Sequence, residues 1–76
     1  MKELIEHIAK ALVDHPQEVF VKEIEDEQGM IVQLSVHADD MGKVIGKQGR
    51  VAKAIRSVLH AAALKENKRV RLDIVE

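Results

Sequence analysis

Two glycines separated by two polar residues form the segment of this chain best suited to chemistry. Gly46-Lys47-Gln48-Gly49 is followed directly by Arg50, where a long helix is predicted to begin. Glycine lets the backbone turn sharply and approach a ligand closely, and a helix N-terminus offers free amide N–H groups to an anion. With Lys47 and Arg50 on either side, the segment is suited to contact with a sugar-phosphate backbone. The alternative is that the glycines only make a tight connection between two helices.

The glycine spacing excludes two common nucleotide-binding motifs. A P-loop has four residues between its glycines and a Ser or Thr after Gly-Lys, whereas three residues separate Gly42 from Gly46, and Gln48 follows Lys47. A dinucleotide-binding fingerprint follows a strand, whereas these glycines lie in a predicted helix-loop-helix. We therefore expect no nucleotide hydrolysis.

Metal sites, cofactors and enzyme activity are not expected from the remaining polar residues. The four histidines fall in four different predicted elements, and none has the short spacing of a zinc motif. They are His7, His15, His37 and His60. The carboxylates within residues 23–27 have no nucleophile, general base or substrate cavity beside them.

The composition is typical of one small folded domain. The 76 residues are 46% hydrophobic and 33% charged, with no cysteine and one aromatic residue, Phe20, which is expected in the core. This is too apolar for disorder and too interrupted by charge for a membrane span of about 20 residues. Lys2, Glu3 and Glu6 interrupt any apolar run at the N-terminus, so no signal peptide is predicted. We expect a single cytoplasmic domain over residues 1–76.

Charge is distributed very unevenly along the chain, although the formal net charge is only −1. Residues 1–40 carry three basic and ten acidic side chains, a balance of minus seven. Residues 41–71 carry nine basic side chains and one acidic side chain, a balance of plus eight. A basic half of this kind favours a polyanionic ligand. Solvated basic residues on exposed helix faces are the alternative explanation.

The hydrophobic pattern predicts the order helix, strand, strand, helix, helix, strand. The predicted helices cover residues 2–13, about 40–45 and 50–64, and the predicted strands cover residues 19–25, 30–37 and 70–74. Asp39 or Asp40 is expected to cap the short helix, and Asn67 is expected to end the long helix in a left-handed conformation. The two helices make a crossover that returns the last strand parallel to an earlier one. We therefore expect an α+β domain in which three helices cover one face of a three-stranded mixed sheet.

The segment Val44-Ile45-Gly46-Lys47-Gln48-Gly49-Arg50, followed by Ile55, resembles the signature of the KH domain. In that family a GXXG loop clamps nucleic-acid backbone over about four nucleotides. The order of elements is similar to the type II, bacterial form, and the likeness extends over essentially all of the chain, as in small stand-alone bacterial KH proteins of the KhpA type. The resemblance implies a non-catalytic protein that binds single-stranded RNA and acts as an RNA chaperone or post-transcriptional regulator.

The resemblance also implies which residues would bind RNA. Gly46, Lys47, Gln48 and Gly49 would contact phosphates, with Lys43, Arg50 and Lys53 as charged neighbours, and Val44 and Ile45 would help to form a groove for bases. Further candidates for this groove are Val32, Leu34, Val36 and His37. For the first three of these, a place in the core is the alternative. The chain has no Trp or Tyr, so a platform of stacking aromatics is excluded, whereas an aliphatic groove is not.

The long predicted helix has more apolar residues than one core stripe requires. The stripe expected in the core consists of Val51, Ala54, Ile55, Val58 and Ala62, and a second apolar edge consists of Ala52, Leu59 and Ala63. That edge either widens the core face or forms a dimer interface. The resemblance implies a homodimer, or a heterodimer with a larger KH-containing protein, so a protein-interaction adaptor is the alternative function.

Overall fold

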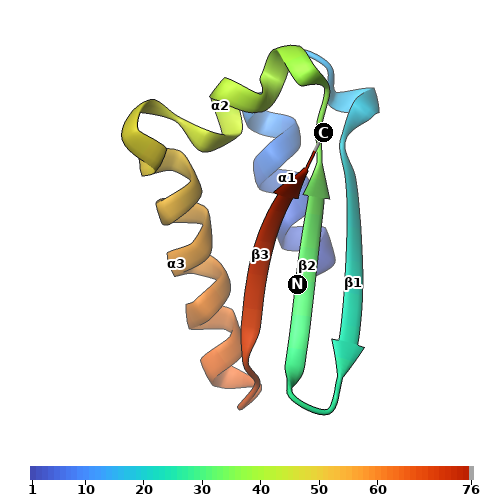
Figure 1. Cartoon of the computed structure of the whole chain (residues 1–76), viewed down its shortest axis with the longest axis vertical. Coiled ribbons are helices and arrows are strands. Elements are labelled where there is room, and N and C mark those ends of the chain that lie inside the picture. The colour runs from blue at the N-terminus through green and yellow to red at the C-terminus, as the bar shows by residue number, and fades with distance from the viewer. Residues whose placement is uncertain (76) are drawn as a thin grey trace.

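A computed structural model describes residues 1–75 and has the helices and strands in the predicted order (Figure 1). The elements are α1 (Lys2–Leu12), β1 (Phe20–Asp26), β2 (Gly29–Ser35), α2 (Met41–Ile45), α3 (Arg50–Lys65) and β3 (Val70–Val75). Three single turns of 3₁₀ helix connect them: η1 (Pro16–Glu18), η2 (Ala38–Asp40) and η3 (Lys47–Gly49). The left-handed stop predicted at Asn67 is confirmed, because its φ is 55°. No helix within residues 1–75 is long and apolar enough to cross a membrane.

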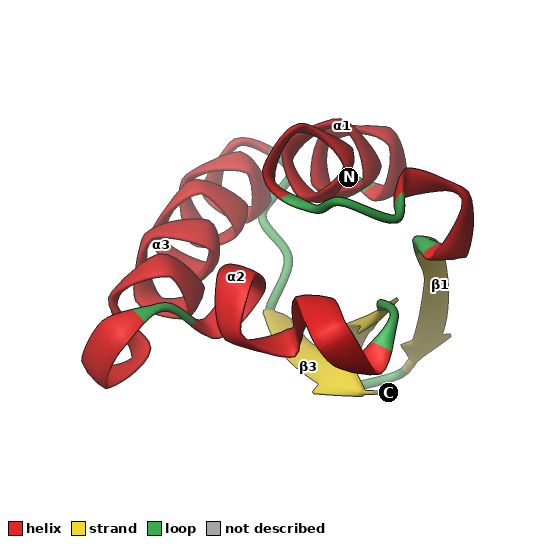
Figure 2. Cartoon of the chain, turned by 90° about the horizontal axis from the view of Figure 1, so that it is seen from above, coloured by secondary structure: helices red, strands yellow, loops and turns green. Residues whose placement is uncertain are grey.

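The sheet has the order β1-β2-β3, with β2 in the centre. Strands β1 and β2 are antiparallel, with Val21 opposite Leu34, whereas β2 and β3 are parallel, with Val32 opposite Leu72. Seen from above, the helices lie on one side of the sheet (Figure 2). The α+β class, the mixed three-stranded sheet and the helical layer on one face are therefore confirmed.

Helix α3 presents only part of the expected stripe to the core: Ile55 is buried and Val51 packs beside the core, as expected, but the rest of the buried face lies on a neighbouring stripe. Ala52, Leu59 and Ala63, the proposed second edge, are buried within the chain, and the Leu59 side chain has no exposed surface. Ala54 is exposed, and Val58 is 43% exposed. Of the two alternatives for this edge, the structure favours the wider core face over the dimer interface, because Ala52, Leu59 and Ala63 are already buried within this chain.

Phe20 is the second correction to the expected core. It is 62% exposed, whereas its neighbours Val19 and Val21 are buried. Successive side chains of a strand point to opposite faces, and Val21 occupies the face beneath the helices, so Phe20 projects from the open face of the sheet. The single aromatic residue of the chain therefore contributes little to the core.

Candidate nucleic-acid interface

The loop between α2 and α3 has a backbone that glycine makes possible. Gly46 and Gly49 have φ angles of 76° and 74°, and Gln48 between them has φ 58°. A Cβ atom at Gly46 would collide with the Val51 side chain, whereas a Cβ at Gly49 would meet nothing within 4 Å. Gly46 is therefore required by both conformation and space, and Gly49 by conformation alone.

Helix α3 begins immediately after this loop without an acidic side chain or a side-chain cap at its N-terminus. Its N-cap, Gly49, makes no side-chain hydrogen bond, and no acidic residue lies in its first turn. The first amide N–H groups of a helix and its dipole favour an anion at this position. Lys47 and Arg50 add two positive charges next to it.

A groove of about 460 Å³ runs between the α2–α3 corner and strand β3. It is lined by Ile45, Gly49, Ala52, Arg56, Leu72, Asp73, Ile74 and Val75. Strand β3 is an edge strand of the sheet, and such a strand carries backbone N–H and C=O groups that no neighbouring strand pairs with. One wall of the groove is therefore helical and carries Ile45, Ala52 and the cationic Arg56, and the other offers backbone hydrogen-bonding groups. Figure 1 shows the α2–α3 corner at the end of the molecule opposite the β1–β2 turn.

Four basic side chains around the loop form no ion pair with a carboxylate of the described residues. Among the ion pairs formed within residues 1–75, none includes Lys47, Arg50, Lys53 or Arg56. Arg56 lines the groove directly but is not among the site residues expected from the sequence. Arg56 lies three residues after Lys53, about one helical turn away, so the sequence already places both on the same face of the helix.

The structure separates several other expected groove residues from this groove. Val32, Leu34 and Val36 are buried in the core, so their side chains have no surface with which to receive a base. Val44 is also fully buried, because α2 turns it toward the core, whereas its neighbour Ile45 lines the groove. The inward positions of β2 are needed beneath the helices, and the groove takes its strand residues from β3 instead.

His37 is not a groove-lining residue either. Its ring stacks on the ring of His15, with the centroids 4.2 Å apart. Its Nδ1 atom accepts a hydrogen bond from the backbone N–H of Asp39 at 3.0 Å, which caps η2. His37 therefore belongs to the corner that leads from β2 into η2.

Lys43 is engaged in ion pairs with two carboxylates. Its Nζ atom contacts Asp14 and lies 3.8 Å from Oδ1 of Asp40. Hydrogen bonding to the Asp14 carboxylate is the main cause that raises the pKa of Lys43, and the charge of Asp40 adds to it. The ammonium group of Lys43 therefore links α2 to the end of α1, in addition to the phosphate contact expected of it.

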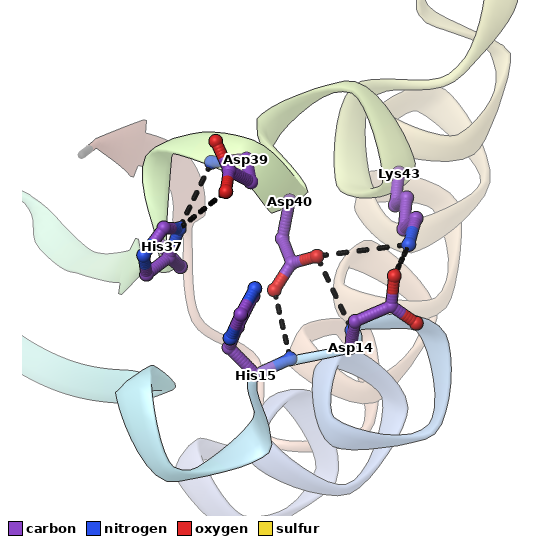
Figure 3. Close-up of polar contacts among 6 residues, drawn as sticks. All are labelled: Asp14, His15, His37, Asp39, Asp40 and Lys43. Atoms are coloured by element: carbon purple, nitrogen blue, oxygen red, sulfur yellow. Dashed lines mark hydrogen bonds and ion pairs between the residues drawn. The ribbon is translucent and has the colours of Figure 1, made fainter.

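Asp40 occupies the N-cap position of the short helix, as expected, but its buried side chain makes no cap hydrogen bond. Its side chain is 1% exposed and accepts hydrogen bonds from the backbone N–H groups of Asp14, at 3.2 Å, and His15, at 3.0 Å (Figure 3). Burial by itself would raise the pKa of Asp40, but these two hydrogen bonds and the nearby charges of His15 and Lys43 outweigh it and lower the pKa. Neither Asp39 nor Asp40 makes a side-chain cap for α2, because the Asp40 carboxylate faces the loop after α1.

Comparisons with known proteins identify similar chains over the full length. The family described as KhpA/KhpB, KH domain, matches residues 2–74. A protein of Halalkalibacterium halodurans named RNA-binding protein KhpA is 64% identical over 76 residues, which is 100% of both chains. Proteins with the same name from Clostridium acetobutylicum and Listeria monocytogenes are 63% and 50% identical, covering 99% and 100% of this chain and 100% of their own. No solved structure matches the chain.

Proposed function

Because the chain belongs to the KhpA/KhpB KH-domain family, we propose that it binds single-stranded RNA in the groove between the α2–α3 corner and strand β3. The observation that carries the proposal is the position of the glycine loop at the N-terminus of α3, beside a groove that combines the aliphatic side chains of Ile45 and Ile74 with Arg56. The relatives named as RNA-binding proteins support the same ligand.

In this proposal the phosphates lie on the loop, and the bases lie in the groove. Amide groups near Lys47 and the start of α3 receive one phosphate, and Lys47, Arg50, Lys53 and Arg56 attract the neighbouring ones. Bases enter the groove against Ile45 and Ile74. The free edge of β3 and the Asp73 carboxylate offer hydrogen-bonding partners to the base edges.

Such a site binds RNA modestly and with little sequence preference. Phosphate contacts position a strand without reading its sequence, and stacking on aromatic rings, the usual strong contribution of single-strand binders, has no counterpart in the groove lining. We propose that the protein acts in the cytoplasm as an RNA chaperone or post-transcriptional regulator, without a catalytic step.

The loop is tested by reversing its charge. We expect Lys47→Asp/Gln48→Asp to weaken binding of a labelled single-stranded RNA at least tenfold by fluorescence anisotropy. The matched control is Lys22→Asp/Gln28→Asp, which makes the same change of net charge on β1 and its turn and should retain most of the affinity. Wild-type affinity must also fall as salt rises.

Two results would contradict the assignment of the loop. One is equal affinity of the loop variant and the wild type, and the other is an equal loss in the control variant, which would indicate attraction by net charge alone. Circular dichroism melts of both variants verify that the fold is retained. A DNA oligonucleotide of the same sequence, bound equally well, would extend the ligand class to single-stranded DNA.

A second function is favoured by an exposed apolar groove between α1 and α3. It has a volume of about 350 Å³ and is lined by Ile8, Leu12, Arg50, Val51, Ala54, Ile55 and Val58. We propose that a second copy of the chain covers the apolar side chains of this surface, so that two RNA sites are held together at a high effective concentration. A larger KH-containing protein is the alternative occupant.

The oligomeric state tests the self-association proposal. We expect the wild type to behave as a dimer in size-exclusion chromatography with light scattering, and Val58→Asp to be a monomer with an unchanged circular dichroism spectrum. Arg71→Asp, on the open face of the sheet, is the control and should remain dimeric. A monomeric wild type at concentrations of several hundred micromolar would contradict self-association, and a complex formed only with the larger KH protein would identify the alternative occupant.

A further inference from the structure

Two histidines that are far apart in the sequence meet at one corner of the fold. His15 follows α1, and His37 follows β2, yet their rings stack with an interplanar angle of 22° (Figure 3). The carboxylate of Asp39 lies next to His37. One potential ligand atom from each of these three residues lies within 4.8 Å of the other two.

We propose that His15, His37 and Asp39 form a binding site for a divalent transition-metal ion, with Zn²⁺ as the representative ligand. Two imidazole nitrogens and one carboxylate oxygen suit zinc, nickel or cobalt. Mg²⁺ and Ca²⁺ prefer all-oxygen surroundings and are therefore not the expected ions. Three protein ligands leave at least one coordination position for water.

One distance in this corner is close to that of a metal site, whereas the three potential ligand atoms together lie within 4.8 Å of one another, so binding requires the side chains to move closer. Nδ1 of His37 and Oδ2 of Asp39 are 3.7 Å apart, whereas two ligand atoms of a tetrahedral zinc ion are separated by about 3.4 Å, given bonds of about 2.0–2.1 Å. The Nδ1 lone pair of His37 faces the amide N–H of Asp39, so a metal bound to Nδ1 would replace that hydrogen bond. The His15 ring must tilt out of its stacked position to direct a lone pair at the same ion.

The main chain at His15 is already held in place, so rotation of the His15 ring is the main adjustment on that side of the site. The backbone N–H of His15 donates a hydrogen bond to the buried carboxylate of Asp40. The side chains of His37 and Asp39 are 37% and 77% exposed, so an ion can enter from solvent. Binding would join the segment after α1 to the segment before α2.

Titration with Zn²⁺, after removal of metal with a chelator, tests the site. We expect a Kd in the micromolar range by isothermal titration calorimetry and a rise in Tm of about 10–20 °C at zinc concentrations near 100 times Kd. His15→Gln and His37→Gln should each weaken zinc binding at least tenfold. His7→Gln and His60→Gln, which change the two exposed histidines of α1 and α3, are the matched controls and should bind zinc as the wild type does.

A measurement on the wild type keeps the test independent of how the variants fold. In ¹H–¹³C NMR spectra, zinc should shift the imidazole signals of His15 and His37 and leave those of His7 and His60 in place. A Kd above about 1 mM, or equal shifts at all four histidines, would overturn the proposal. Zinc binding is measured without RNA, and RNA affinity is to be measured with a chelator present. The two proposals are therefore tested independently, and failure of one does not contradict the other.

Discussion

The carboxylate of Asp40 accepts a hydrogen bond from the backbone N–H of His15 at 3.0 Å, across 25 positions of sequence. The same carboxylate binds the amide of Asp14, and Lys43 lies beside it. Asp40 directly precedes α2, the helix that leads into the glycine loop. The buried carboxylate therefore attaches the helix before the loop to the end of α1, and loop position depends on a residue outside the loop.

Asp40→Asn should destabilise the fold. An amide side chain has one oxygen in place of two and presents N–H groups to the amide of Asp14 or His15, so a buried donor loses its acceptor. We expect Tm to fall by about 5–10 °C. Asp39→Asn, at an exposed neighbouring carboxylate, is the control and should change Tm by less than about 2 °C when both are measured with a chelator. Equal Tm values for the two variants would contradict the role given to Asp40.

Gly46→Ala should damage the loop, whereas Gly42→Ala should stabilise the protein. A Cβ at Gly46 collides with Val51 at a positive φ, but a Cβ at Gly42 meets nothing within 4 Å in helix α2. Replacing a helical glycine by alanine contributes about 0.5–1 kcal/mol of stability. Chemical denaturation of both variants measures the difference. A Gly46→Ala variant as stable as the wild type would show that the loop conformation is not required.

Arg56→Ala tests whether RNA follows the groove beyond the loop. We expect RNA affinity to fall by about three- to tenfold and the slope of log K against log salt to decrease by about 0.7, as for the loss of one phosphate contact with a single strand. Arg71→Ala removes the same charge from the open face of the sheet and should preserve the slope. Identical salt slopes for Arg56→Ala and the wild type would remove Arg56 from the RNA path.

Leu59→Ala and Val58→Ala compare adjacent positions on α3. Leu59 has no exposed surface, so its truncation leaves a cavity and should lower the free energy of unfolding by about 2–5 kcal/mol. Val58 is 43% exposed, and its truncation should lower the free energy of unfolding by less than about 1 kcal/mol in the monomer. Urea denaturation at low protein concentration measures both. The reverse order would mean that α3 is rotated toward the face originally expected.

The order and type of the elements could be predicted from the sequence because each has a clear local signal. The proline after α1, the alternation in β2 and the glycines before α3 determine where helices and strands end. The type II KH arrangement follows from this order and is supported by the family match over residues 2–74. The glycine loop is predictable for the same reason, because its motif consists of four consecutive residues and needs no contact between distant segments.

The features that could not be predicted depend on contacts between distant segments. Helix α3 has two adjacent apolar stripes, and composition alone does not decide between Val58 and Leu59 for the core. The pairing of His15 with His37 and the burial of Asp40 likewise require segments that only the tertiary fold brings together. The resemblance places strand residues of the groove on β2, but the regular alternation of β2 marks a buried central strand, and the structure takes the strand wall from β3.

Strand β3 has a consequence for the timing of folding. It is the last element of the described chain, and it pairs in parallel with β2, which precedes the whole α2–α3 segment. Loop closure over such a distance makes this pairing slow compared with formation of the hairpin and helices. Because β3 is one wall of the groove, the groove is complete only after this strand has docked on β2. Under the proposed function, the site for RNA is therefore among the last parts of the fold to form.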